Sequence, residues 1–131
     1  TIPIEPIAEV VVTDTEIHFN PILFEFNKYE ITKQSKKILD KLVYIMNQNV
    51  AMEIYIKAHT DSKGTAKYNL NLSEKRVQST VNYILSKGIS TTRISGKGFG
   101  EAEPRINCGD KCTDEEHFQN RRSEFLIVKD K

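Results

Sequence analysis

The sequence lacks tryptophan, has no long apolar run and carries almost no excess of charge of either sign. Its 131 residues include 19 Lys and Arg and 18 Asp and Glu, which gives a formal net charge of +1. Without a bulk positive charge, nothing draws the chain onto nucleic acid or an anionic membrane. No run approaches the roughly 18 apolar residues of a membrane-spanning helix. We therefore expect no nucleic-acid partner and no membrane insertion by this segment itself.

The composition favours one globular domain. Hydrophobic residues make up 38% of the chain and charged residues 28%, which is too apolar for a disordered chain. A length of 131 residues is usual for a single domain, and six Phe and five Tyr can supply the larger core side chains. The sequence starts at Thr1 without an initiator Met or a signal-peptide pattern. We expect a processed chain or a fragment of a longer one, in which any export signal, lipid anchor or membrane domain would lie upstream.

The N-terminal part divides into a linker and the start of the domain. Residues 1–15 hold two of the four prolines and are predicted to be a linker that leads into a domain over residues 16–131, although Val10–Val12 could add an edge strand. Apolar residues alternate with period two over residues 17–26, around Pro21. This alternation predicts a strand that is broken or bulged near the proline.

Two amphipathic helices are predicted between further strands. One helix follows Thr32 as its cap, carries an apolar stripe through Leu39, Leu42 and Met46, and ends at residues 47–49. A second helix is expected over residues 70–87, stopped by Gly88. Alternating or apolar segments predict strands over residues 53–58, 93–99 and 123–128, with a long loop over residues 100–122. The order β-α-β-α-β-β predicts an α+β, two-layer sandwich: a mixed sheet with helices packed on one face.

His59, Thr60 and Asp61 come directly after a predicted strand, where sheets often place ligand-binding residues. Asp61 could equally cap the turn or the next helix. His59 and Asp61 could also be two metal ligands, but no further ligands follow at a recognisable spacing, so we expect no metal and no cofactor.

Three arginines are further candidates. Arg76 lies at the border of the buried stripe of the second helix and could present its guanidinium at the helix edge, or form a surface ion pair with Glu74. Arg121 and Arg122 lie at the mouth of the last predicted strand. Because neighbouring strand residues point to opposite faces, at most one of these two can face a given site.

The glycines and cysteines favour structural roles. Gly96, Gly98 and Gly100 match no phosphate-binding pattern, and we interpret them as turn-making residues. Cys108 and Cys112 would close a tight disulfide in an oxidising compartment, worth about 2 kcal/mol. His117 would give zinc only a third ligand, so the disulfide is favoured. No nucleophile, base and orienting residue stand in a suggestive arrangement, and we expect no enzyme.

Three motifs follow one another along the sequence. They are His59-Thr60-Asp61 with Gly64, Tyr68-Asn69, Leu72-Ser73 and Arg76-Val77; Gly98-x-Gly100-Glu101 with Pro104; and Asn120-Arg121-Arg122. In this order the motifs resemble the OmpA-like C-terminal domain, the peptidoglycan-associated module of OmpA-type porins, Pal lipoproteins and MotB-type stators. The resemblance covers residues 17–129. It implies a mixed sheet with two helices on one face.

The resemblance also implies a function, the non-catalytic binding of a peptidoglycan stem peptide through diaminopimelate. This binding would anchor a protein of the Gram-negative cell envelope to the wall, at the periplasmic face of the outer membrane, with a missing upstream region as the tether. By resemblance, Asp61 receives the diaminopimelate ammonium and Arg76 grips its carboxylate. The same pocket would be lined by Asn27, Thr60, Asn69 and one of Arg121 and Arg122. A lysine in the stem peptide lacks that carboxylate, so we expect discrimination against lysine-type walls.

The sequence departs from the family pattern beside this site, and other functions stay open. Ala58 stands where the family often has Gly, and Val77 where it often has Ala; both add bulk that could narrow the pocket or shift the helix. The alternatives are a wall anchor for a motor stator or secretion machine, and a protein-interaction domain that has lost wall binding. A wall hydrolase is disfavoured because no acid-base set is visible.

Overall fold

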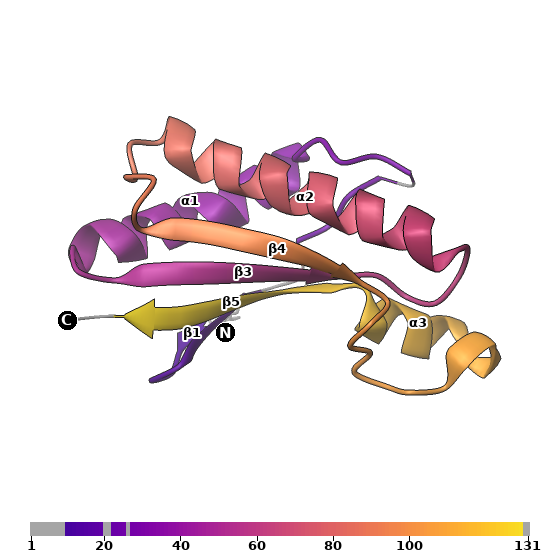
Figure 1. Ribbon diagram of the computed structural model, residues 1–131. Helices are drawn as coiled ribbons and strands as arrows, with labels where there is room; N and C mark the ends of the chain where they lie inside the picture. Colours follow the sequence, from indigo (N-terminus) through magenta and orange to yellow (C-terminus); the bar gives the residue numbers. More distant parts are fainter. Residues whose placement is uncertain (1–9, 20–21, 26, 130–131) are drawn as a thin grey trace, which may run out of the picture.

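The computed structural model describes residues 10–19, 22–25 and 27–129. The strands are β1 (Val10–Val12), β2 (Glu16–Phe19), β3 (Glu53–His59), β4 (Ile94–Gly100) and β5 (Arg122–Lys129). The helices are α1 (Lys33–Gln48), α2 (Ala66–Ser86) and α3 (Asp114–Asn120), with a 3-10 turn, η2 (Gly109–Lys111). The strands form one sheet in the order β1-β2-β5-β3-β4, in which β3 and β4 are parallel and the other neighbours are antiparallel. Figure 1 shows α1 and α2 on the same face of this sheet.

This arrangement confirms the α+β fold, the mixed sheet and the packing of helices on one face. The edge strand expected at Val10–Val12 is present and pairs with β2. Residues 1–9 of the expected linker lie outside the described residues, and the proposed boundary at residues 15 and 16 stays a prediction. Within the described residues, no helix combines the length and apolarity needed to cross a membrane.

Helix α1 forms as the apolar stripe predicts. The Thr32 side chain accepts a hydrogen bond from the Ser35 N–H at the helix start, and Leu39, Leu42 and Met46 are fully buried. Helix α2 starts four residues earlier than expected, because the Thr65 side chain caps it by accepting from the Tyr68 N–H.

The strand expected over residues 17–26 is wrong beyond Phe19. Residues 22–25 form no strand, and residues 20–21 and 26 lie outside the described part of the chain. Both backbone groups of Leu23 bond to the Ser35 hydroxyl of α1, at 3.0 and 3.1 Å. This hydroxyl replaces a neighbouring strand as the hydrogen-bond partner.

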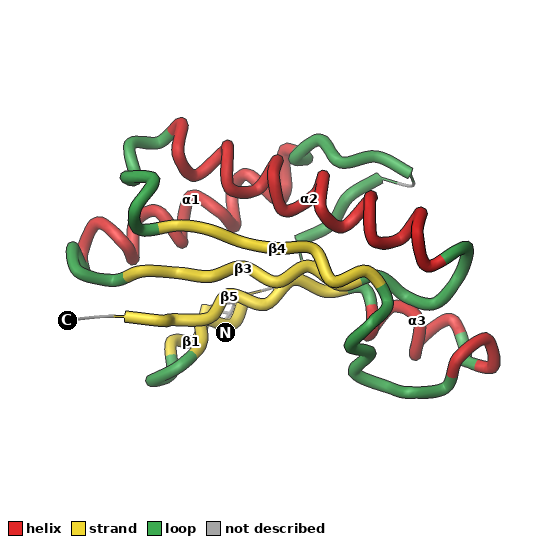
Figure 2. Tube along the Cα trace, in the orientation of Figure 1, coloured by secondary structure: helices red, strands yellow, loops and turns green. Residues whose placement is uncertain are grey.

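The long loop expected over residues 100–122 is also wrong, because it contains η2 and α3. Thr113 and Glu116 form a capping box at the start of α3. Figure 2 shows α3 beside one end of the sheet, away from the layer of α1 and α2.

The three glycines interpreted as turn-making residues lie inside β4 instead. A Cβ atom on Gly98 would lie 2.5 Å from the Ser73 Oγ of α2, and one on Gly96 would lie 2.7 Å from a methyl group of Val77. Only Gly100 of the three has a positive φ, at 55°. The glycines therefore let α2 lie directly against β4, which fixes the start of α2 beside the end of β3.

Candidate functional site

A pocket of about 420 Å³ opens where β3 ends and α2 begins. Its walls come from the turn after β3, the first turns of α2, the segment around Phe24 and the junction of α3 with β5. All seven candidate residues line this pocket: Asn27, Thr60, Asp61, Asn69, Arg76, Arg121 and Arg122. The expectation that at most one of Arg121 and Arg122 could face the site is wrong, because Arg121 is the C-cap of α3 and does not follow the alternation of a strand. The structure therefore brings together residues that lie far apart in the sequence.

Asp61 is the buried acid of the pocket, with 8% of its surface exposed. Its Oδ1 accepts a hydrogen bond from the Lys63 N–H at 3.0 Å, and its Oδ2 lies 2.6 Å from Arg121 Nη1. Through the hydrogen bond from Lys63, Asp61 caps the turn after β3, which is one of the roles that the sequence left open. The contact of Oδ2 gives the carboxylate a fixed direction toward the pocket-lining Arg121.

The side chains of Arg121 and Arg122 contact different partners. Arg121 is the C-cap of α3, and Arg122 is the first residue of β5. Arg121 pairs with Asp61, while its side chain stays 43% exposed. Arg122 donates from Nε to Glu124 at 3.1 Å and from Nη2 to the Glu103 carbonyl at 3.0 Å. Of the two, Arg121 is therefore the one whose charge meets the acid of the pocket.

Arg76 lines the pocket from α2 and is bonded to the chain segment before α1. Its Nε donates to the Lys28 carbonyl at 2.9 Å, its Nη2 donates to the Glu25 carbonyl at 3.3 Å, and its guanidinium lies 4.8 Å from the centre of the Phe24 ring. Burial lowers the pKa of Arg76 from its ordinary value, against the opposite influence of Tyr68, and an arginine stays charged at neutral pH. Arg76 thus ties the segment around Phe24 to α2.

Asn69 and Thr60 are buried and engaged in holding the turn after β3. The Asn69 amide donates to the Lys63 carbonyl and to Glu101 Oε1, each at 2.9 Å, and the Thr60 hydroxyl donates to the Asp61 carbonyl at 2.9 Å. Asn27, on the other wall, is exposed and has a positive φ of 60°. Asn69 and Thr60 therefore position Asp61. Asn27 lines the pocket from a segment that is neither helix nor strand.

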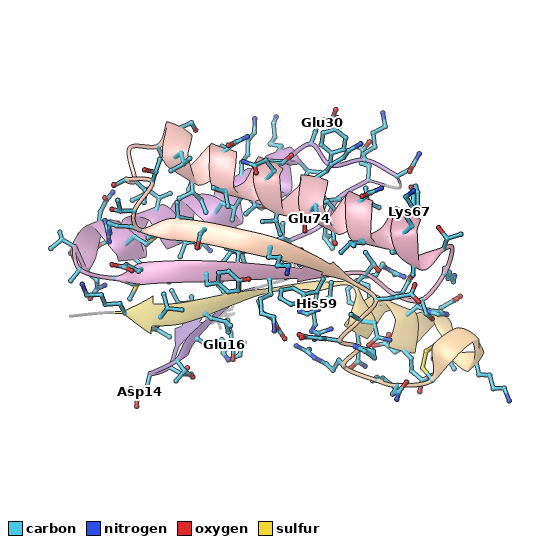
Figure 3. All side chains as sticks on the ribbon, in the orientation of Figure 1. Asp14, Glu16, Glu30, His59, Lys67 and Glu74 are labelled. Atoms are coloured by element: carbon cyan, nitrogen blue, oxygen red, sulfur yellow. A yellow bond between two sulfur atoms is a disulfide. The ribbon has the colours of Figure 1, made fainter. Side chains whose placement is uncertain are left out.

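His59, a candidate from the sequence, also lines the pocket, and its ring forms a polar cluster with Glu124. Figure 3 labels His59 near the end of β3, where its Nε2 lies 3.1 Å from Glu124 Oε1 and its ring stacks on Phe99. Burial, with the charge of Arg122 adding to it, lowers the pKa of His59, although Glu124 opposes the shift. His59 is therefore neutral near neutral pH and donates its Nε2–H to Glu124.

The disulfide between Cys108 and Cys112 is present, with the two Cα atoms 5.1 Å apart. Within the described residues, the grouping of side chains close enough to hold a metal consists of these two cysteines and Glu116. Cysteines bonded to each other are not available as thiolate ligands. This loop also contacts the site, because the Ser62 hydroxyl donates to the Gly109 carbonyl at 2.6 Å.

Leu23 and Phe118 lie at the site and were missed by sequence reasoning, whereas Tyr68 was named in the motif but not as a pocket residue. All three side chains are more than two-fifths exposed and line the pocket beside its charged groups. His117 lies behind Asp61, with Nδ1 4.0 Å from Asp61 Oδ2. The capping box at Thr113 was the signal that would have placed Phe118 and His117 on a helix.

The two departures from the family pattern have different effects. Ala58 lines the pocket, so its methyl group does occupy space there. Val77 is buried against Gly96 and is not among the residues that line the pocket. The added bulk of Val77 therefore bears on the contact between α2 and β4.

Comparisons with known proteins identify a matching family and several relatives. A family model described as the OmpA family matches residues 23–121. The peptidoglycan-associated lipoprotein of Haemophilus influenzae is 29% identical over 112 residues, which are 86% of this chain and 71% of that protein. Outer membrane protein A of Klebsiella aerogenes is 37% identical over 97 residues, which are 72% of this chain and 27% of that protein.

Solved structures share the fold. A putative MotB-like protein from Desulfovibrio vulgaris has a TM-score of 0.72 at 27% identity, covering 81% of this chain and 67% of that one. The cell wall anchor of the T6SS from Pseudomonas aeruginosa has a TM-score of 0.74 at 19% identity, covering 91% and 87% of the two chains. The second likeness concerns the fold alone.

Proposed function

The chain belongs to the OmpA family, and we propose that its pocket binds the diaminopimelate residue of a peptidoglycan stem peptide. The observation that carries this proposal is a buried carboxylate, Asp61, in one pocket with the guanidinium groups of Arg121 and Arg76. The proposed role is non-catalytic. Asp61 is held by an arginine and a backbone N–H, an arrangement that suits binding a charge and not transferring a proton.

The free end of diaminopimelate is a zwitterion, with an ammonium and a carboxylate on one carbon. A site for it needs an acid and a planar bidentate donor within a few ångströms of each other. In the proposed complex, Asp61 receives the ammonium, while Arg76 and Arg121 share the carboxylate. Arg76 uses its Nε and one Nη2 hydrogen on backbone carbonyls, so its other N–H groups can face the ligand.

The same charges would discriminate between cell walls. A lysine in the third position of the stem peptide would satisfy Asp61 and leave both arginines without a ligand carboxylate. Unpaired polar groups in a partly buried site weaken binding strongly. We therefore expect a preference for diaminopimelate over lysine.

The proposed biological role is to anchor an outer-membrane or periplasmic protein to the wall, with this domain at the periplasmic face of the outer membrane. A tether to that membrane would come from sequence upstream of the domain. The relatives named for OmpA and for a peptidoglycan-associated lipoprotein support this role. Wall anchoring of a stator or of a secretion machine is the alternative. The putative MotB-like protein and the T6SS cell wall anchor share the fold with this chain, and the fold does not distinguish between these roles.

Calorimetric titration with two muropeptides, one with diaminopimelate and one with lysine in the third position, tests the proposal. We expect saturable binding of the diaminopimelate form, lost in Asp61→Asn and strongly weakened in Arg76→Ala. Glu74→Gln, an exposed acid of α2, is the matched control and should bind as wild type does. Equal affinity for both muropeptides, or binding that survives the change at Asp61, would overturn the proposal. Absence of binding by folded wild type would favour a protein-interaction domain.

A further inference from the structure

His117 is a buried histidine with an unsatisfied ring nitrogen. The residue lies on α3 with 4% of its surface exposed, and its Nδ1 has no hydrogen-bond partner in the part of the chain that the structure describes. Buried polar atoms are nearly always paired, so an exception calls for an explanation. The explanation lies in its neighbour, because Nδ1 is 4.0 Å from Asp61 Oδ2.

That carboxylate oxygen is already held by an arginine that a ligand could attract. Arg121 Nη1 lies 2.6 Å from Asp61 Oδ2, and the Arg121 side chain is 43% exposed and lines the pocket. A ligand carboxylate entering the pocket therefore competes with Asp61 for this guanidinium. If Arg121 turns toward the ligand, the buried Asp61 loses a charge-assisted hydrogen bond.

His117 can supply the replacement. A movement of about 1 Å would bring Nδ1 and Oδ2 to an ordinary hydrogen-bond distance near 2.9 Å. His117 is not among the residues that line the pocket, so it would act through Asp61 and not through the ligand.

We propose that His117 is a positioning residue that donates its Nδ1–H to Asp61 Oδ2 when diaminopimelate occupies the pocket. The inference rests on the proposed function and deepens it. In the free domain Arg121 holds Asp61. In the complex Arg121 serves the ligand carboxylate, and His117 keeps Asp61 charged and directed at the ligand ammonium.

Two amide substitutions separate this role from packing. The amide nitrogen of asparagine can occupy the position of the histidine Nδ1, whereas that of glutamine reaches the position of Nε2. We expect His117→Asn to bind the diaminopimelate muropeptide within about threefold of wild type. His117→Gln and His117→Leu should bind about tenfold more weakly, the usual effect of losing a hydrogen bond to a charged group.

A direct readout is the 15N spectrum of the His117 ring. Addition of the muropeptide should move the Nδ1 resonance to that of a hydrogen-bonded N–H in wild type, and His117→Asn removes the signal for assignment. Equal affinities of the folded Asn, Gln and Leu variants, or an unchanged Nδ1 resonance on saturation, would overturn the inference while leaving the proposed function intact. Failure of wild type to bind would overturn both.

Discussion

The Asp61 carboxylate and the Arg121 guanidinium meet at 2.6 Å across 60 residues of sequence. This ion pair joins the end of β3 to the end of α3 and gives the pocket an internal counter-charge before any ligand arrives. A simple amine must compete with Arg121 for the acid. A zwitterion offers a carboxylate to the displaced arginine in return, and so the pair itself favours diaminopimelate.

Asp61→Asn should abolish ligand binding and leave the fold nearly unchanged. We expect the affinity for the diaminopimelate muropeptide to fall at least 100-fold, because an amide cannot balance the ligand ammonium. The free energy of unfolding should change by less than about 1 kcal/mol, since Arg121 is 43% exposed and water can solvate it. Calorimetric titration and urea unfolding measure the two effects. Asp114→Asn is the control, because the Asp114 side chain is fully exposed. A loss of several kcal/mol in Asp61→Asn would show that the pair is mainly structural.

Arg76→Lys should impair both binding and stability. A lysine keeps the charge but loses the planar fork that now bonds to the Lys28 and Glu25 carbonyls. We expect the free energy of unfolding to fall by about 1–2 kcal/mol and the affinity to fall at least tenfold. Denaturant unfolding and titration of the same preparation give both values. Lys67→Ala, an exposed cation on α2 that Figure 3 labels, removes a similar charge and should change neither. Wild-type affinity in Arg76→Lys would show that charge alone is sufficient.

Gly98→Ala should destabilise the domain by pushing α2 away from β4. The new Cβ atom would meet Ser73 Oγ at 2.5 Å, and Ser73 also accepts a hydrogen bond from the Gly100 N–H. Overpacking of this kind costs about 1–3 kcal/mol. Thermal unfolding measures the loss. Ser95→Ala, an exposed residue of the same strand, is the control and should have little effect. A Gly98→Ala domain as stable as wild type would show that α2 can shift freely.

The sequence predicts those parts of the fold in which burial and apolar character coincide. Helix α1 buries Leu39, Leu42 and Met46, and its spacing alone predicts it. The early turns of α2 bury the polar residues Asn69 and Ser73 instead of apolar ones. The apolar stripe therefore begins after the true start of the helix, and the helix was predicted to start four residues too late. Helix α3 has seven residues, which is too short for a periodic signal.

The candidate site residues came from the resemblance of the ordered motifs, and the contacts among these residues could not be predicted. All seven candidates line one pocket, but Leu23 and Phe118, which also line it, lie outside the motifs. The pairing of Asp61 with Arg121 depends on chain closure over 60 residues, which no local pattern encodes. The place of His117 behind Asp61 depends on α3, and so it was missed together with that helix.

Acidification should destabilise the domain through His59. Burial, with the charge of Arg122 adding to it, lowers the pKa of His59 below its ordinary value of 6.5. Below pH 6.5 the unfolded chain therefore binds a proton that the folded domain does not, and stability falls as the pH decreases through the lowered pKa. The pKa of Glu124 is also lowered: burial would raise it, but the hydrogen bond from His59 and the charge of Arg122 outweigh burial. Protonation of Glu124 therefore causes a second loss of stability below its ordinary pKa of 4.5.

Urea unfolding at pH 7.5, 6.0 and 5.0 measures this dependence. His59→Gln keeps a donor for Glu124 and does not titrate, so the loss between pH 6.5 and 5.0 should largely disappear in that variant. His18→Gln is the matched control, because it removes an exposed histidine and leaves the contacts of His59 in place. An unchanged pH dependence in His59→Gln would assign the acid sensitivity to other groups.

The disulfide should support both the stability of the domain and the geometry of its pocket. It closes the turn directly before α3, the helix whose C-cap is Arg121, and the Gly109 carbonyl within this turn accepts from Ser62, next to Asp61. Replacing both cysteines by serine removes a short-loop constraint of about 2 kcal/mol and should lower Tm by roughly 6–10 °C. The affinity for the muropeptide should fall several-fold as well, because α3 and the turn after β3 lose a shared support.

Ser62→Ala removes only the hydrogen bond from Ser62 to the Gly109 carbonyl, so it should reproduce part of the loss of affinity with little change in Tm. If the cysteine variant loses stability but binds as wild type does, the hydrophobic and ionic contacts of α3 are sufficient to place Arg121 without the disulfide.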